Sequence, residues 1–121
     1  MNTLIILAHG SRREESNLEI KTLAEQVKAL AGTEYDLVEY AYLELIEPSL
    51  PQAIDNSINN GASNITVLPY FLNSGNHVKR DIPEMIKTAE EKYPTCLFKV
   101  SACIGMIEDM PELILQQARV S

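Results

Sequence analysis

Four short apolar segments alternate with four segments of helical character, and this alternation restricts the fold more than any other feature. Strands and helices that alternate with short connections form right-handed crossovers, which give a parallel sheet covered on both faces. We therefore expect an α/β fold: a single-domain, three-layer αβα sandwich over residues 1–121, with a four-stranded parallel sheet in the order 2-1-3-4. The predicted strands are 4–8, 35–43, 64–69 and 96–102, and the predicted helices are 14–31, 49–60, 81–93 and 109–119.

Three of the predicted helices share one start signal. Ser49-Leu50-Pro51-Gln52 places a capping side chain first and a glutamine three residues later, and residues 81–84 and 109–112 repeat the pattern as Asp-x-Pro-Glu. This is the pattern of a capping box, with proline in the first turn, where its missing N–H costs nothing. We expect helices to begin at these three capping residues.

The first strand ends directly in His9-Gly10-Ser11-Arg12-Arg13, and ligands of open parallel sheets bind beyond the carboxyl ends of the strands. The other histidine, His77, follows the third strand, and Glu44 ends the second. We therefore expect His9, His77 and Glu44 at one edge of the sheet. Neutral imidazole can bind a divalent metal or accept a proton, and Glu44 can be a ligand or a proton relay. Structural histidines and a solvated loop acid remain equally open on this pattern alone.

Positive charge gathers around the two histidines, although the chain has a net charge of −7. Cations near a helix N-terminus oppose the helix dipole, so this placement favours an anionic ligand over simple solvation. The loop after the third strand adds an apolar wall and a turn that suit a broad, flat organic ligand, with core packing of the aromatic rings as the alternative. The expected ligand-binding residues are Ser11, Arg12, Arg13, Tyr70, Phe71, Ser74, Gly75 and Lys79.

Several classes of function lack the residues that they need. The negative net charge argues against nucleic acid or an anionic membrane as partner, and no glycine-rich phosphate cradle for a nucleotide is present. The first apolar run is too short for a signal sequence or a membrane span, which predicts a cytoplasmic location. Cys96 and Cys103 would lie roughly 23 Å apart on one strand, so we expect buried free thiols rather than a disulfide or a metal cluster.

Three segments closely resemble the small CbiX-type sirohydrochlorin chelatases, which belong with the class II tetrapyrrole chelatases. They are Leu-Ala-His-Gly-Ser-Arg at 7–12, Tyr-Leu-Glu-Leu-Ile-Glu-Pro-Ser-Leu at 42–50 and Leu-Pro-Tyr-Phe-Leu-Asn-Ser-Gly-Asn-His-Val-Lys-Arg-Asp-Ile-Pro at 68–83. The resemblance covers essentially the whole chain, in order and with matching spacing. It implies a chelatase-like half, since short members look like one lobe of the longer chelatases and work as homodimers.

The resemblance further implies a lyase that inserts a divalent metal into a sirohydrochlorin-type tetrapyrrole without ATP, in cobalamin or sirohaem biosynthesis. His9 and His77 match the histidines that bind the metal and help to remove the pyrrole protons, and Glu44 matches an acid that assists them. The metal is a substrate, with cobalt expected first, iron next and nickel also compatible, and no permanently bound cofactor is expected. A metal or tetrapyrrole carrier that catalyses nothing is the alternative.

The residues agree with this chemistry on separate grounds. A polycarboxylate ring explains cations clustered in an acidic chain. Metal insertion needs a ligand that binds the ion and then releases it, which imidazole does more readily than a cage of thiolates. It also needs a base for the pyrrole N–H protons, and a histidine near its pKa meets that need.

Overall fold

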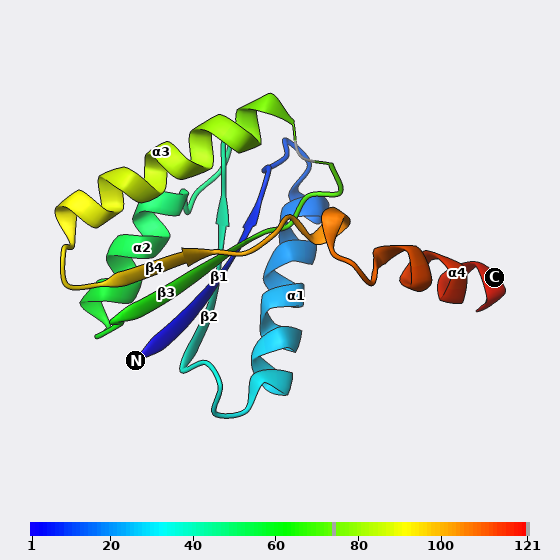
Figure 1. Cartoon of the computed structure of the whole chain (residues 1–121), viewed down its shortest axis with the longest axis horizontal. Coiled ribbons are helices and arrows are strands. Elements are labelled where there is room, and N and C mark those ends of the chain that lie inside the picture. The colour runs from blue at the N-terminus through cyan, green and yellow to red at the C-terminus, as the bar shows by residue number, and fades with distance from the viewer. Residues whose placement is uncertain (74, 121) are drawn as a thin grey trace.

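The computed structural model describes residues 1–73 and 75–120, with residues 76–78 described by their backbone alone. The strands form one parallel sheet in the order β2-β1-β3-β4, which confirms the predicted topology (Figure 1). The observed second and fourth strands are shorter than predicted, and the third matches its predicted bounds. The strands are β1 (Asn2–Ala8), β2 (Leu37–Tyr42), β3 (Asn64–Pro69) and β4 (Leu97–Val100).

The helices follow the strands in alternation, as predicted. The first has its predicted bounds, and the second begins with the expected capping box: Gln52 N donates to Ser49 Oγ (3.3 Å) and Ser49 N donates to Gln52 Oε1 (2.8 Å). The fourth begins one residue after Asp109. The helices are α1 (Glu14–Ala31), α2 (Leu50–Asn59), α3 (Asn76–Lys92) and α4 (Met110–Val120), with a short 3-10 turn, η1 (Ile104–Met106), before α4.

The predicted start of the third helix at Asp81 is wrong. α3 begins at Asn76, after Gly75 in an extended conformation, and Lys79 N donates to Gly75 O (3.1 Å). Pro83 therefore lies inside the helix, where its ring cannot donate to the carbonyl of Lys79. The Asp-x-Pro-Glu pattern is a local signal that is compatible with a helix start, but α3 begins more than one turn before it. Residues 76–80, expected in a loop, are helical as a result.

The main core lies between one face of the sheet and helices α2 and α3. Because side chains alternate along a strand, β1 and β3 send every second residue to this face. Ile5, Leu7, Ile65 and Val67 are completely or almost completely buried there. The helices contribute buried aliphatic residues of their own, namely Leu50, Ala53, Ile54, Ile82, Ile86 and Ala89.

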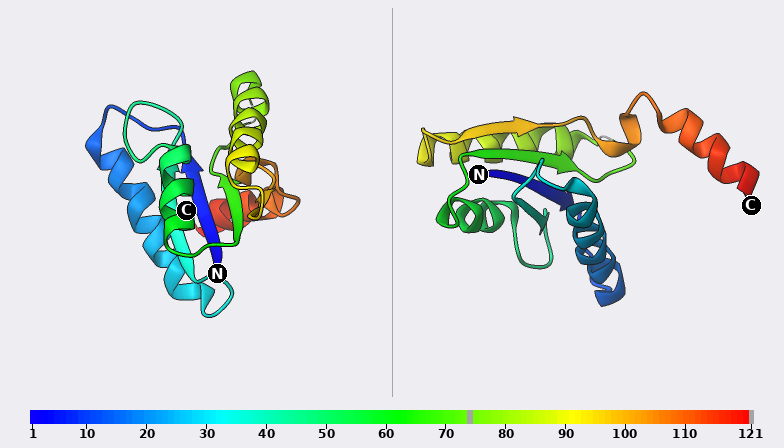
Figure 2. Two further views of the ribbon diagram at one scale, coloured as in Figure 1. Left: turned by 90° about the vertical axis from the view of Figure 1, so that its left-hand side faces the viewer. Right: turned by 90° about the horizontal axis from the view of Figure 1, so that it is seen from below.

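The opposite face is only half covered. α1 packs against β1 and β2, and Leu4 and Ile6 are buried beneath it. In register with Leu4 on the same face lie Thr66 of β3 and then Lys99 of β4, which is exposed. α4 makes its main contacts with η1 and extends away from the sheet (Figure 2). The second helical layer of the sandwich therefore covers β1 and β2 and leaves β3 and β4 bare.

Among the described residues, no helix combines the length and the apolar character that crossing a membrane requires. The cytoplasmic location stays a prediction.

We expect Leu7→Ala to lower the free energy of unfolding by about 3 kcal/mol, because it leaves a cavity in the core. Leu7 is 0% exposed, whereas Leu30 is 89% exposed on α1, so Leu30→Ala is a matched control expected to change stability by about 0.5 kcal/mol or less. Chemical denaturation of both variants measures the difference. Equal losses would contradict the assignment of the core.

Candidate functional site

His9 lies at the tip of β1, between the ends of the two neighbouring strands. On one side Glu44 N donates to His9 O (3.1 Å), and on the other Tyr70 N donates to Leu7 O (2.8 Å). Both bonds continue the sheet ladder past the last residues of the strands. The structure therefore brings His9, Glu44 and Tyr70 together at one edge of the sheet, and the side chains of all three are exposed.

Gly10 makes this close approach possible. Its φ is +94°, a conformation that residues with a Cβ rarely adopt, and an added Cβ would lie 2.0 Å from the carbonyl oxygen of Glu44. A side chain at position 10 would therefore push the end of β2 away from His9.

Asn17 fixes the loop that follows His9, and the sequence prediction missed it. Its side chain is 6% exposed; Oδ1 accepts from Ser11 N (3.0 Å) and Nδ2 donates to Ser11 O (2.8 Å). The Tyr42 hydroxyl donates to Asn17 O (2.6 Å). Burial, and to a lesser extent Tyr40, raises the pKa of Tyr42, so this hydroxyl keeps its proton at neutral pH. An asparagine inside a helix was the sole sequence signal for this role.

Phe71 packs beneath His9. The two ring centroids are 4.1 Å apart, with the ring planes tilted by 49°. Phe71 is 4% exposed and belongs to the core cluster, so a ligand can reach little of its surface. The accessible apolar surface of this loop comes from Tyr70 (41% exposed) and Leu72 (71% exposed). The alternative of core packing, left open by the sequence, therefore describes Phe71 but not its neighbours.

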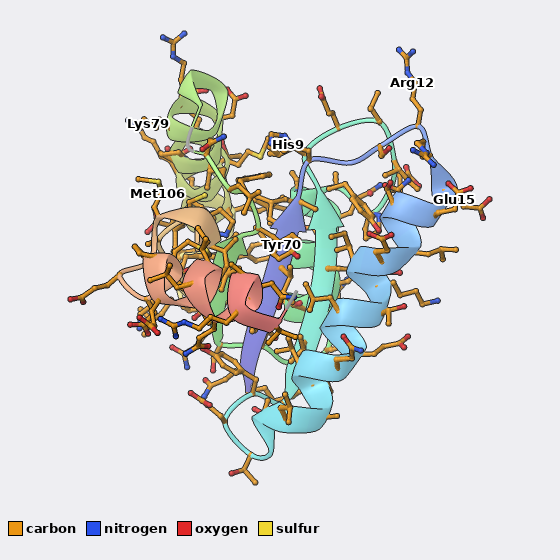
Figure 3. The ribbon with its side chains drawn as sticks, turned by 90° about the vertical axis from the view of Figure 1, so that its right-hand side faces the viewer. His9, Arg12, Glu15, Tyr70, Lys79 and Met106 are labelled. Atoms are coloured by element: carbon orange, nitrogen blue, oxygen red, sulfur yellow. The ribbon has the colours of Figure 1, made fainter. Side chains whose placement is uncertain are left out.

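The predicted cations are all exposed around this edge. Arg12 points outward from its loop beside α1, while Lys79 lies on α3 across from it (Figure 3). Arg13 Nε is 3.7 Å from Glu15 Oε2, and both side chains are more than three-quarters exposed, so this pair contributes little. Lys79 and Arg80 lie near the start of α3, whose first turn contains no acidic residue. The helix dipole opposes such cations, and a bound anion would relieve that repulsion.

The remaining predicted residues are placed in part. Gly75 precedes α3 directly, and the backbone of His77 lies in the first turn of α3, at the same edge as His9. The side chain of His77 and all of Ser74 lie outside the described residues. Within the part of the chain that is described, no three His, Cys, Asp or Glu side chains gather closely enough to hold a metal ion.

Both cysteines are free and buried, which confirms the prediction of buried thiols. Burial raises the pKa of the Cys96 thiol.

The family model named CbiX matches residues 3–121. The chain belongs to the CbiX family. A sirohydrochlorin cobaltochelatase of Methanococcus aeolicus is 41% identical over 90 residues, which are 74% of this chain and 62% of that protein. A chloroplastic sirohydrochlorin ferrochelatase of Arabidopsis thaliana is 36% identical over 102 residues, covering 84% of this chain and 44% of that protein.

Among solved structures, the sirohydrochlorin chelatase SirB from Bacillus subtilis subspecies spizizenii, in complex with cobalt, matches this CbiX chain with a TM-score of 0.84. The identity is 28%, and the match covers 98% of this chain and 50% of SirB. The CbiX chain therefore spans less than two thirds of these relatives, and about half of SirB.

We expect Gly10→Ala to disrupt the junction between His9 and Glu44. Gly32→Ala is the matched control, because Gly32 also has a positive φ (+59°) but has nothing within 4 Å of an added Cβ. Each substitution costs about 1–3 kcal/mol of backbone strain. Gly10→Ala should in addition speed amide hydrogen exchange at Glu44 by about tenfold or more, since the bond to His9 O is lost. Equal exchange at Glu44 in both variants would contradict the role assigned to Gly10.

Proposed function

We propose that this chain is a sirohydrochlorin chelatase, which inserts a divalent metal into a sirohydrochlorin-type tetrapyrrole without ATP. The observation that carries the proposal is the exposed imidazole of His9, held between the ends of β2 and β3 at the edge where α3 begins with His77 in its first turn. Relatives with names of this activity, one a cobaltochelatase and one a ferrochelatase, support it.

His9 and His77 bind the incoming metal in this proposal. Imidazole suits divalent cobalt, iron and nickel, and a site with few protein ligands gives the ion up to the four ring nitrogens. As each imidazole gives up the ion, its freed nitrogen accepts a proton that leaves a pyrrole nitrogen, and Glu44 relays the protons to water from its exposed position at the end of β2. Cobalt is the first expectation for the metal and iron the second, supported by the cobalt complex of SirB.

The macrocycle brings negative charge to an edge that carries exposed cations. Its carboxylates are complementary in charge to Arg12, Arg13 and Lys79 around the site. A guanidinium group can bind a carboxylate through two parallel hydrogen bonds. Tyr70 and the backbone at Gly75 line the ring's path to His9. Ser11, held by Asn17, fixes the loop that carries the two arginines.

We expect His9→Ala and His77→Ala each to slow metal insertion by about 100-fold or more, because each removes a metal ligand and a base. Visible absorption of sirohydrochlorin with Co²⁺, Fe²⁺ and Ni²⁺ in parallel measures the rate. Gln26→Ala, which changes an exposed residue on α1, is the control and should keep the wild-type rate of insertion. Several turnovers per protein chain support an enzyme, whereas one loading event without turnover would identify a carrier and refute the proposed activity.

We further propose that two copies form the working unit, which agrees with the length of SirB, of which this chain covers 50%. α4 exposes apolar residues to solvent: Leu113 (46% exposed), Ile114 (61%) and Val120 (82%). The bare face of β3 and β4 exposes Leu97 (70%) and half-exposes Leu68. A second copy fits both surfaces at once, since a two-fold axis lets each α4 lie on the other copy's sheet.

We expect Ile114→Asp to convert the dimer to a monomer, because it puts a charge into the apolar face of α4. Gln116→Asp, which adds the same charge on the polar side of the helix, is the matched control and should leave the dimer intact. Sedimentation velocity at the concentration of the insertion assay measures the assembly. A wild-type monomer that inserts metal would refute the two-copy unit while leaving the proposed activity standing.

A further inference from the structure

The exposed ring of His9 packs against the buried ring of Phe71. The ring centroids lie 4.1 Å apart. Phe71 is 4% exposed, so packing holds its ring on all other sides, while His9 is exposed and keeps an open edge toward solvent. An aromatic ring against a fixed aromatic ring prefers a narrow set of tilts and offsets. The Phe71 ring therefore limits rotation of the imidazole.

No polar group among the described residues orients the imidazole instead of Phe71. In the described part of the chain, no hydrogen bond or ion pair reaches the His9 imidazole. Histidines that bind metals usually donate their second N–H to a carboxylate or a carbonyl, which fixes the ring and makes it a stronger ligand. At His9 the orientation comes from packing against the Phe71 ring, and neither ring nitrogen has a protein partner among the described residues.

Phe71 is itself held by the segment that follows β4. Its carbonyl accepts hydrogen bonds from Gly105 N (2.9 Å) and from the buried Cys103 thiol. Gly105 packs so closely that an added Cβ would lie 1.9 Å from the carbonyl oxygen of Leu72. The segment after β4 thus lies directly against the backbone of residues 71–72, and η1 fixes the loop that carries the Phe71 ring.

We propose that Phe71 is the positioning residue for His9, and that Gly105 and Cys103 hold Phe71 in place. The proposal rests on the proposed function in taking His9 as the metal ligand. Because the imidazole is already oriented, metal binding loses less side-chain entropy, and because it has no polar partner, the ligand stays weak enough to release the ion. Phe71 touches neither metal nor macrocycle and acts through His9 alone.

NMR of the His9 ring protons tests the contact without any assay of function. Phe71→Leu removes the ring current and should shift the His9 ring signals, whereas Phe98→Leu should leave them in place. Phe98, on β4, packs against the same core and is the chain's other phenylalanine, so both variants remove a ring from that core. Unchanged His9 signals in Phe71→Leu, or equal shifts in both variants, would overturn the proposal.

Titration with Co²⁺, followed by visible absorption, tests the consequence for the ligand. Phe71→Leu should weaken cobalt binding by about tenfold, the scale seen when groups that orient metal ligands are removed. It should lower kcat for insertion and leave the KM for sirohydrochlorin unchanged, because Phe71 does not touch the macrocycle. Phe71→Tyr, which keeps the ring, should restore cobalt affinity. Cobalt affinity that is unchanged in Phe71→Leu, or lowered equally in Phe98→Leu, would overturn the proposal.

Gly105→Ala tests the hold from η1, because Gly105 N donates to Phe71 O and the Phe71 ring contacts His9. It should shift the His9 signals, while Gly32→Ala, where nothing lies within 4 Å of an added Cβ, is the control. If Gly105→Ala does not fold, Cys103→Ala, which removes the thiol donor, takes its place. His9 signals unmoved by these changes would refute the hold from η1. A wild-type protein that binds no cobalt would refute the proposed function, while the NMR shifts would still decide the contact.

Discussion

Backbone hydrogen bonds that run past the ends of the strands are the interaction on which the rest of this site depends. The strands themselves end at Ala8, Tyr42 and Pro69, yet pairing continues from Glu44 to His9 and from Tyr70 to Leu7. An imidazole on an ordinary loop would sample many positions. At this edge the His9 backbone is bonded to Glu44 on one side, and Leu7, two residues earlier, is bonded to Tyr70 on the other, so a rigid, buried strand positions His9. Gly10 is what permits that closeness.

The polar groups of the site stabilise backbone rather than the exposed side chains. Asn17 uses both ends of its amide on Ser11, and Tyr42 donates to the carbonyl of Asn17. The imidazole of His9 meets an aromatic ring instead. This division suits the proposed transfer of a metal. A ligand strengthened by a polar partner holds its ion more tightly, whereas a chelatase has to give its ion up to the macrocycle.

Local patterns predicted the elements well, because each strand and helix carries its own signal. The bounds of β3 and α1 and the capping box at Ser49 follow from neighbouring residues alone. The start of α3 did not follow, since the Asp-x-Pro-Glu pattern is also compatible with a helix that began a turn earlier. The roles of Asn17 and Gly105 depend on backbone groups brought near by folding, 6 residues away for Asn17 but more than 30 for Gly105 and Phe71. Residue spacing gives no sign of such contacts.

The position of α4 could not follow from sequence for a different reason. Its amphipathic pattern predicts a helix with one face packed against another surface. The pattern does not show whether that surface belongs to the same chain or to a second copy. α4 follows η1 closely and extends away from the sheet, and η1 lies against Phe71 and Leu72. A partner that seats α4 therefore also steadies η1, and through η1 the ring beneath His9. The half-covered sheet thus lies next to the site, and if the proposed two-copy unit forms, an isolated copy should hold the His9 ring less firmly than a paired one.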